Sequence, residues 1–191
     1  MSEPDQNLDE RLQEYVKDAV QSAPGPPTRD PVNRPMIHHW CDAIGDTNPI
    51  YIDEELAAQS VHGGLVAPPT MLQAWGMVGL RGRGPSLPEH ERAATQVGDN
   101  RDPGPVGLLH QAGYTSVVAT DCEQEYMRYL RPGDVLHMSG GLESISSEKT
   151  TALGDGYFVT NKSSYWDQND ELVAEMLFRV LWFKPRRQGG E

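Results

Sequence analysis

The sequence is poor in cysteine and contains no long apolar run. Its two cysteines, Cys41 and Cys122, stand at a spacing that matches neither a disulfide framework nor a zinc site, and the 6 histidines show no metal-binding spacing. No apolar stretch approaches the roughly 18–20 residues that a membrane-spanning helix needs. Residues 1–9 are acidic and polar, unlike a signal peptide. We therefore expect a soluble cytoplasmic protein that holds no metal.

Basic residues are outnumbered. The chain has 16 Lys and Arg against 28 Asp and Glu, which gives a net charge of −12. A surface this acidic disfavours nucleic acid and anionic membranes as partners. A polyanionic ligand would need a local cluster of Arg or Lys, or a second protein that supplies one.

The N-terminal half predicts helices. Apolar residues at helical spacing, together with residues suited to helix caps, indicate helices over residues 8–22, 34–43, 53–58 and 68–80. The first should end at a Pro-rich breaker over residues 23–27, which places it before the main domain. The last is apolar nearly all round, with Trp75 and Met77 among its residues, so it should be buried on most sides.

The C-terminal half predicts strands. Residues 81–113 carry no strong period. β-branched and aromatic residues then indicate strands in hairpin order, with turns at residues 131–134 and 167–170; the strands span residues 114–122, 125–130, 135–145, 156–166 and 172–183. The last of them has one fully apolar face and a mixed second face, which suits a central strand with one buried face; a helix over the same residues fits less well. Helices followed by antiparallel strands make an α+β domain, in which one sheet covers the buried helix.

Three motifs carry a family resemblance. Residues 45–51 read Gly-Asp-Thr-Asn-Pro-Ile-Tyr, residues 63–70 read Gly-Gly-Leu-Val-Ala-Pro-Pro-Thr, and residues 129–134 read Tyr-Leu-Arg-Pro-Gly-Asp. Together they resemble the MaoC-like hydratases and dehydratases of the hotdog fold, over roughly residues 34–184. The resemblance implies an antiparallel sheet wrapped around a central buried helix. It divides the chain into an N-terminal helix and linker (1–30), a MaoC-like hotdog domain (31–184) and a linker stub or tail (185–191).

The chemistry of that family depends on an Asp and on a His five positions later, which activate water for addition to an enoyl-CoA. No cofactor is implied, because the acyl-CoA is the substrate. Here Asp46 and Asn48 are present, but Tyr51 stands at the His position. A phenol, with an ordinary pKa of about 10, is a poor base near neutral pH. The family also places a Gly N–H for the thioester oxygen at the start of the central helix, where this chain has Ala67 and then two prolines, which lack an N–H.

The two departures together resemble the non-catalytic half of two-part dehydratases. In those proteins a degenerate hotdog opens space for a bulky acyl chain, while an intact hotdog supplies Asp and His. The resemblance is strongest to α subunits of actinobacterial steroid side-chain hydratases. It implies a catalytic hotdog β subunit as partner, in a heterodimer or an α2β2 heterotetramer, and a steroid enoyl-CoA as substrate. In such subunits an extension after the hotdog docks an aldolase, and residues 185–191 resemble the linker to that extension.

The resemblance also nominates residues that line the acyl site. These are Tyr51, His62, Gly64, Leu65, Val66, Ala67 and Trp75, with Arg81 and Arg83 as contacts for the coenzyme A phosphates. Simpler interpretations stay open, because Asp46 and Asn48 also suit an ordinary turn after a helix. Two other functions stay open as well. One is a self-sufficient homodimeric hydratase with Asp46 as base and Tyr51 as acid, and the other is a non-enzymatic acyl-CoA binding or scaffold module.

Overall fold

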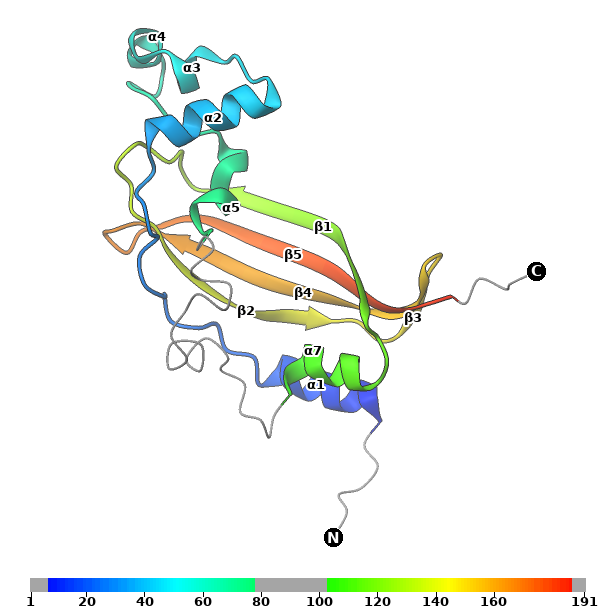
Figure 1. Cartoon of the computed structure of the whole chain (residues 1–191). Coiled ribbons are helices and arrows are strands. Elements are labelled where there is room, and N and C mark those ends of the chain that lie inside the picture. The colour runs from blue at the N-terminus through cyan, green and yellow to red at the C-terminus, as the bar shows by residue number, and fades with distance from the viewer. Residues whose placement is uncertain (1–6, 78–102, 187–191) are drawn as a thin grey trace, which may run out of the picture.

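The computed structural model describes residues 7–77 and 103–186 (Figure 1). Helices come first along the chain: α1 (Leu8–Lys17), α2 (Arg34–Ile44), α3 (Pro49–Ile52), α4 (Glu54–Gln59), η1 (Pro69–Met71), α5 (Leu72–Trp75) and α7 (Gly104–Gln111). The strands follow: β1 (Ser116–Tyr126), β2 (His137–Ile145), β3 (Lys149–Thr150), β4 (Gly154–Trp166) and β5 (Leu172–Pro185). The sequence predicts this order, in which the helices precede the strands. Helix α7 is an addition, since it lies where the sequence shows no period.

Capping residues fix the ends of the helices near the N-terminal motif. Asn33 Oδ1 accepts a backbone N–H in the first turn of α2 (3.0 Å), and Gly45 ends that helix with a positive φ of 72°. Asp53 caps α4 in the same way. Both helices therefore lie within a residue of their predicted bounds. The short helix α3 between them is not in the prediction, and it begins with the proline of the motif.

The first helix is shorter than predicted, because α1 ends at Lys17 and not at residue 22. Residues 19–28 instead run along the outer edge of β2, and we call them the edge strap. The prolines at positions 24, 26 and 27 cannot donate a hydrogen bond, and other residues of the strap bond to the sheet instead. The N–H groups of Ser22, Gly25 and Thr28 donate to the carbonyls of Gly140 (3.0 Å), Met138 (2.8 Å) and Leu136 (2.7 Å).

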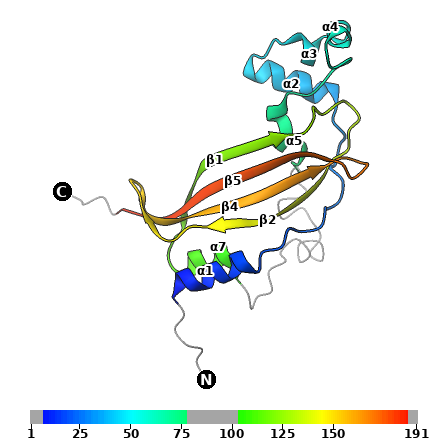
Figure 2. The same ribbon diagram turned by 180° about the vertical axis from the view of Figure 1, so that it is seen from behind.

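The strands form one antiparallel sheet in the order β1-β5-β4-β2, with β3 paired to β4. β5 is a central strand, as predicted. β1 is one strand where two were predicted, because it pairs with β5 along its whole length. The predicted hairpin order is wrong at the first connection, since β1 and β2 lie at opposite edges of the sheet (Figure 2). Residues 127–136 between them, which include the predicted turn, cross the end of the sheet, and we call them the crossover.

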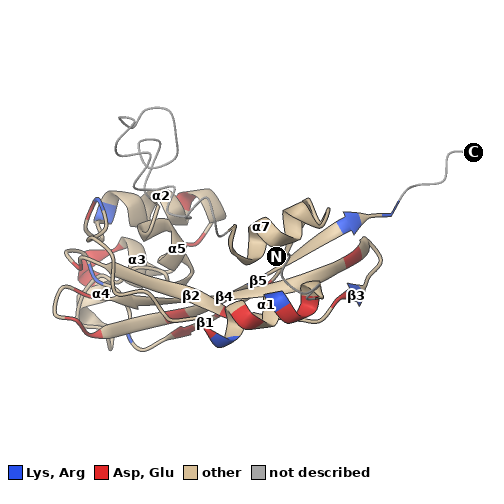
Figure 3. Ribbon diagram, turned by 90° about the horizontal axis from the view of Figure 1, so that it is seen from below, with Lys and Arg blue, Asp and Glu red and all other residues tan. Residues whose placement is uncertain are grey.

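Helices α2, α5 and α7 lie on the same side of the sheet (Figure 3), where they help to build two separate buried clusters. The prediction had one long buried helix over residues 68–80. In the described residues, η1 and α5 end at Trp75, and Met77 is 59% exposed, so its predicted burial is wrong. Gly76 ends α5, and its missing Cβ lets the sulfur of Met138 pack against it. Residues 78–80 lie outside the described ranges.

The N-terminal helix packs on the same sheet as the rest of the chain. Leu12 of α1 is fully buried in the cluster that α7 and β4 share. The hydroxyl of Tyr157 on β4 donates to Asp9 Oδ1 (2.5 Å), and Gln13 Nε2 donates to the carbonyl of Ile145 on β2 (2.9 Å). These contacts tie α1 to the middle and to the edge of the sheet.

One arginine holds the crossover against the sheet. Arg128 pairs with Asp134 of the crossover (2.7 Å) and with Asp167 in the turn between β4 and β5 (2.8 Å). We call these three residues the Arg128 clamp. Burial would raise the pKa of the Asp167 carboxyl, but the N–H groups of Glu171 and Asn169 and the Arg128 guanidinium outweigh it and lower that pKa. The clamp therefore fixes both loops at this end of the sheet.

Replacing Arg128 with Ala should lower the free energy of unfolding by about 2–4 kcal/mol, because shielded carboxylates lose their partner. The side chains of Asp134 and Asp167 are only 11% and 2% exposed. Arg29→Ala is the matched control. Arg29 and Asp30 are 71% and 56% exposed, so breaking that pair should cost less than about 1 kcal/mol. Urea unfolding measures both losses, and equal losses would contradict a stabilising clamp.

The clamp also gives a dependence on pH. The pKa of Asp167 is lower in the folded chain, so its stabilising contribution is present above the unfolded pKa of about 3.9 and disappears as the pH falls through the folded value. The free energy of unfolding should therefore drop below about pH 4, and Asp167→Asn should reduce that drop. Asp170→Asn, in the same turn, serves as the control. An acid profile unaltered by Asp167→Asn would argue against this origin of the drop.

Candidate functional site

The motif at the end of α2 forms a tight turn stabilised by its own side chains. The N–H of Asp46 donates to the carbonyl of Cys41 (2.9 Å), as expected after a left-handed glycine. Asp46 Oδ1 accepts the N–H of Asn48 (2.9 Å), and Asn48 Oδ1 accepts the N–H of Ile50 at the start of α3 (3.3 Å). Asp46 is half-buried and Asn48 is exposed. These hydrogen bonds are the ones expected if Asp46 and Asn48 form an ordinary turn after a helix, which is one of the two interpretations that the sequence allows.

Tyr51 is a buried phenol. It lies on α3, is 8% exposed, and belongs to the cluster beneath α2 and α5. Burial raises its pKa to about 12, and its hydrogen bond with Tyr129 and the nearby Asp46 carboxylate act in the same direction. A phenol with this pKa stays protonated near neutral pH and cannot accept a proton there.

The segment that leads into η1 offers few amide donors. The N–H of Ala67 donates to the carbonyl of Leu130 in the crossover (2.8 Å), so it is already engaged. Pro68 and Pro69 follow and have no N–H. No side chain caps this helix start. η1 begins at Pro69, within one residue of the helix start that the sequence predicts.

The crossover adds two residues that the sequence interpretation missed. The ring centroids of His62 and Tyr129 lie 4.5 Å apart, and Arg131 Nη2 donates to the carbonyl of His62 (2.5 Å). Tyr129 also lies close enough to Tyr51 to help raise the pKa of that phenol. The signal is present in the motif at residues 129–134, for which the sequence predicts only a turn. Tyr51, Tyr129, His62 and Arg131 thus form one connected group.

The structure brings most of the nominated site residues together, but as packed core. Five of them are buried in the same cluster: Tyr51, Leu65, Val66, Ala67 and Trp75. His62 and Gly64 are half-buried beside them, and Arg81 and Arg83 lie outside the described residues. The Nε1 of Trp75 is buried without a hydrogen-bond partner among the described residues. An unpaired buried N–H is unfavourable, so it marks a place where a polar ligand atom would be stabilised.

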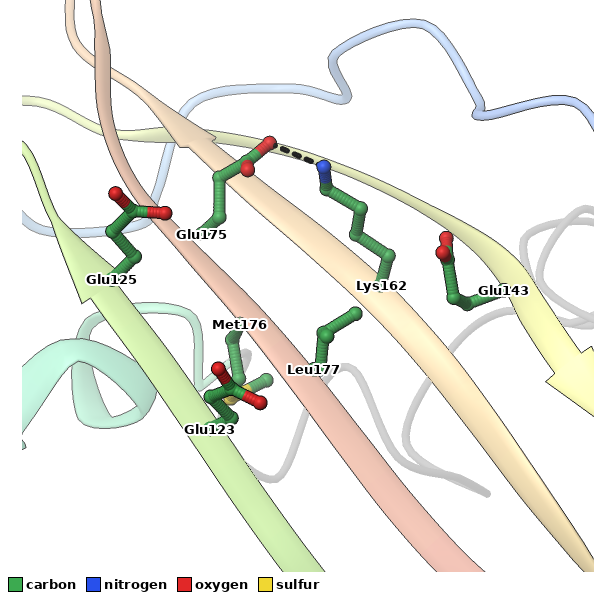
Figure 4. Close-up of a pocket in the computed structure, with 7 residues that line it drawn as sticks. All are labelled: Glu123, Glu125, Glu143, Lys162, Glu175, Met176 and Leu177. Atoms are coloured by element: carbon green, nitrogen blue, oxygen red, sulfur yellow. Dashed lines mark ion pairs between the residues drawn. The ribbon is translucent and has the colours of Figure 1, made fainter.

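A hollow elsewhere on the molecule has the wrong charge for a phosphate-bearing ligand (Figure 4). It measures about 410 Å³, including space open to solvent, and spans β1, β5, β4 and β2. Lys162 and Glu175 form an ion pair across it (2.8 Å). Three further carboxylates line it, those of Glu123, Glu125 and Glu143. None of the nominated residues lies there, and its negative charge disfavours a polyanion.

The sequence matches a family model over most of its length. The model for the FAS1-like dehydratase domain region matches residues 22–176. The chain belongs to the FAS1-like dehydratase family. This confirms the expected kinship with MaoC-like hotdog proteins and the expected α+β hotdog fold.

Relatives of this chain include two named α subunits. The 3-oxo-4,17-pregnadiene-20-carboxyl-CoA hydratase alpha subunit of Mycobacterium tuberculosis is 46% identical over 178 residues, which are 91% of this chain and 52% of that protein. A probable enoyl-CoA hydratase alpha subunit of Thermomonospora curvata is 44% identical over 185 residues, which are 95% of this chain and 54% of that protein. The chain thus spans about half the length of these relatives.

Solved structures agree with the fold. A chain of the ChsH1-ChsH2 complex from Mycobacterium tuberculosis matches with a TM-score of 0.76 and 42% identity, covering 95% of this chain and 94% of that one. A MaoC-like dehydratase from Rhodospirillum rubrum matches with a TM-score of 0.54 and 22% identity, covering 89% and 97%. At that identity the second match supports the hotdog fold alone.

The described residues show neither a metal site nor a membrane span. Within residues 7–77 and 103–186, no group of three or more His, Cys, Asp and Glu side chains is placed to hold a metal ion. The helices in these ranges are all too short or too polar to cross a membrane.

Replacing Tyr51 with Phe tests the buried phenol. At neutral pH the variant should lose no more than about 1 kcal/mol of unfolding free energy, because only the hydroxyl that interacts with Tyr129 is removed. The raised pKa keeps the folded phenol protonated between its unfolded pKa of about 10 and its folded pKa of about 12, so the wild type loses stability as the pH rises through that range. The variant should lose less there.

Urea unfolding at about pH 8 and at about pH 11 measures both effects. If Tyr51→Phe and the wild type lost equal stability in alkali, Tyr51 would not be the protonated phenol described here.

Proposed function

We propose that this chain is the catalytically degenerate hotdog subunit of a heteromeric enoyl-CoA hydratase. A partner hotdog supplies the Asp and His that add water to the double bond. This chain shapes the acyl site for a bulky substrate. The observation that carries the proposal is the buried, protonated phenol of Tyr51 at the place of the imidazole base.

Proton transfer is the first reason that this chain needs a partner. A general base works best with a pKa near the working pH, and the pKa of Tyr51 is about 12. Asp46 remains as a carboxylate, but its Oδ1 accepts the N–H of Asn48. Tyr51 stands at the position of the imidazole, and no hydrogen bond among the described residues joins the Asp46 carboxylate to a side chain that could pass a proton to the α-carbon.

Stabilisation of the thioester oxygen is the second reason. The enolate charge that develops during hydration needs N–H donors aimed at that oxygen. At the start of η1 the amide of Ala67 is engaged by Leu130, and the next two positions are prolines. Loss of a single such donor costs about 10²–10³ in rate, so this half-site is handicapped even if a base were supplied.

The free edge of the sheet provides a surface for the partner. β1 pairs with β5 on one side, and among the described residues no strand pairs with its other side. Val117, Val118 and Tyr126 are 51%, 38% and 37% exposed on this strand. A long exposed edge with apolar side chains is a template for another strand. The sheet of a homologous hotdog could continue here, in a heterodimer or in an α2β2 heterotetramer.

The names of two relatives support the choice of substrate. The Mycobacterium tuberculosis relative is named as an α subunit of a hydratase of 3-oxo-4,17-pregnadiene-20-carboxyl-CoA, and the second relative as a probable enoyl-CoA hydratase α subunit. A steroid side-chain enoyl-CoA is therefore the substrate that we propose. The docking of an aldolase, through an extension like that of the longer relatives, stays a prediction.

The self-sufficient hydratase is the main rival, and the geometry weighs against it. With Tyr51 as the acid, proton donation would have to come from a phenol of pKa about 12 that is 8% exposed. A pure scaffold or acyl-CoA binding module would share this degenerate site, so only activity separates it from a hydratase subunit.

Co-expression with an intact hotdog partner carrying Gly-Asp-x-Asn-Pro-x-His tests the proposal. The pair should hydrate a steroid side-chain enoyl-CoA, while this chain alone should be inactive. Asp46→Asn in this chain should leave the turnover of the pair within about twofold, whereas losing a working base costs at least about a hundredfold. Asn substitution of the partner's own motif aspartate is the matched control and should abolish turnover.

Two outcomes would contradict the proposal. Turnover by this chain alone that Asp46→Asn abolishes would establish the self-sufficient hydratase. A stable pair that binds the enoyl-CoA but turns over no faster than the partner alone would favour the scaffold.

A further inference from the structure

We propose that Tyr129, His62 and Arg131 form the contact for the nucleotide end of coenzyme A. This rests on the proposed function, which makes an acyl-CoA the ligand. The sequence placed the phosphate contacts at Arg81 and Arg83, outside the described residues. Arg131, in contrast, contacts His62, one of the residues expected to line the acyl site.

The guanidinium of Arg131 is held in place but largely unused. Its Nη2 donates to the carbonyl of His62, and its Nη1 lies beside Gly64. An arginine carries five N–H donors, so most of them remain for a ligand. No carboxylate in the described part of the chain pairs with this guanidinium, and the residue is exposed. Such a guanidinium suits bidentate contact with a phosphate.

Five other basic side chains of the described residues are already neutralised. Ion pairs occupy Arg29, Arg34, Arg128, Arg179 and Lys162. In a chain of net charge −12, an arginine without a carboxylate partner beside the acyl site is a local exception. The acidic hollow on the sheet repels the same ligand, so the charge pattern directs a polyanion toward Arg131.

The two aromatic rings supply the other half of a nucleotide site. Tyr129 is 36% exposed, and its ring lies at 56° to the half-buried ring of His62. An exposed aromatic face stacks on a nucleobase without regard to its identity, and a neighbouring guanidinium holds the phosphates. The adenine and the phosphates of coenzyme A match these two parts.

The crossover holds this group rigidly. The N–H of Arg131 donates to Asp134 Oδ2 (2.8 Å), and the N–H of Gly133 donates to the carbonyl of Val32 (2.8 Å). Asp134 is also a member of the Arg128 clamp, which cancels its charge. Binding therefore does not require a loop to become ordered, which lowers its entropic cost.

Calorimetric titration with three probes tests the assignment on the full chain, alone and paired with its catalytic partner. The probes are coenzyme A, dephospho-coenzyme A without the 3′-phosphate, and pantetheine without the nucleotide. Arg131→Gln should weaken binding of coenzyme A by about tenfold, the loss of one charge-assisted hydrogen bond. The same variant should bind pantetheine with unchanged affinity, and its preference for coenzyme A over dephospho-coenzyme A should be smaller.

Substitutions of Tyr129 separate stacking from folding. Tyr129→Ala should also weaken coenzyme A by about tenfold, because the stacking face is lost. Tyr129→Phe keeps the face while removing the hydroxyl that contacts Tyr51, so it should bind as the wild type does. Arg29→Gln, on an exposed arginine outside the group, should bind normally as well.

The outcomes separate this inference from the proposed function. If Arg131→Gln and Tyr129→Ala bind coenzyme A like the wild type while the pair still hydrates its substrate, the nucleotide contact lies elsewhere and the hydratase proposal stands. If the wild-type pair neither binds coenzyme A nor hydrates an enoyl-CoA, the proposed function fails, and the nucleotide contact fails with it.

Discussion

The ion pairs of Arg128 are the interaction on which the geometry of this end of the molecule depends. The crossover runs from one edge of the sheet to the other, past the ends of β5 and β4. It is not a strand, so strand pairing does not hold it in place. Arg128 pairs with Asp134 within the crossover and with Asp167 in the turn after β4. Asp134 also accepts the N–H of Arg131 within the crossover and the N–H of Val32 just before α2. Tyr129, Leu130 and Arg131 are placed against the site segment as a result.

The site that we propose to be degenerate is a stable piece of core, and this is physically coherent. An imidazole base must stay accessible and close to its carboxylate, whereas a tyrosine can be buried at a gain of apolar contact and one hydrogen bond. Tyr51 takes that course. The amide of Ala67 likewise bonds to the crossover and not to a ligand. Under the proposed function, each group that catalysis would have used makes a structural contact instead.

Local signals in the sequence predicted local structure well, and non-local pairing escaped them. Asn33, Gly45 and Asp53 mark the ends of α2 and the start of α4 because caps act within a few residues. The partners of β1 could not be read in this way, since β5 lies some fifty residues further along the chain, and hairpin order is only the default. The site shows the same division. Tyr51 was evident from its motif, whereas the roles of Tyr129 and Arg131 depend on where the crossover passes.

The edge strap limits how this sheet can grow. Backbone donors of residues 22, 25 and 28 already occupy the carbonyls along β2, so that side of the sheet is closed by the chain itself. Within residues 7–77 and 103–186, β1 is the long strand whose outer side is left to accept a neighbour through strand pairing. A sheet with a single receptive side joins one other sheet and then stops, which gives a closed pair and prevents a fibre from propagating.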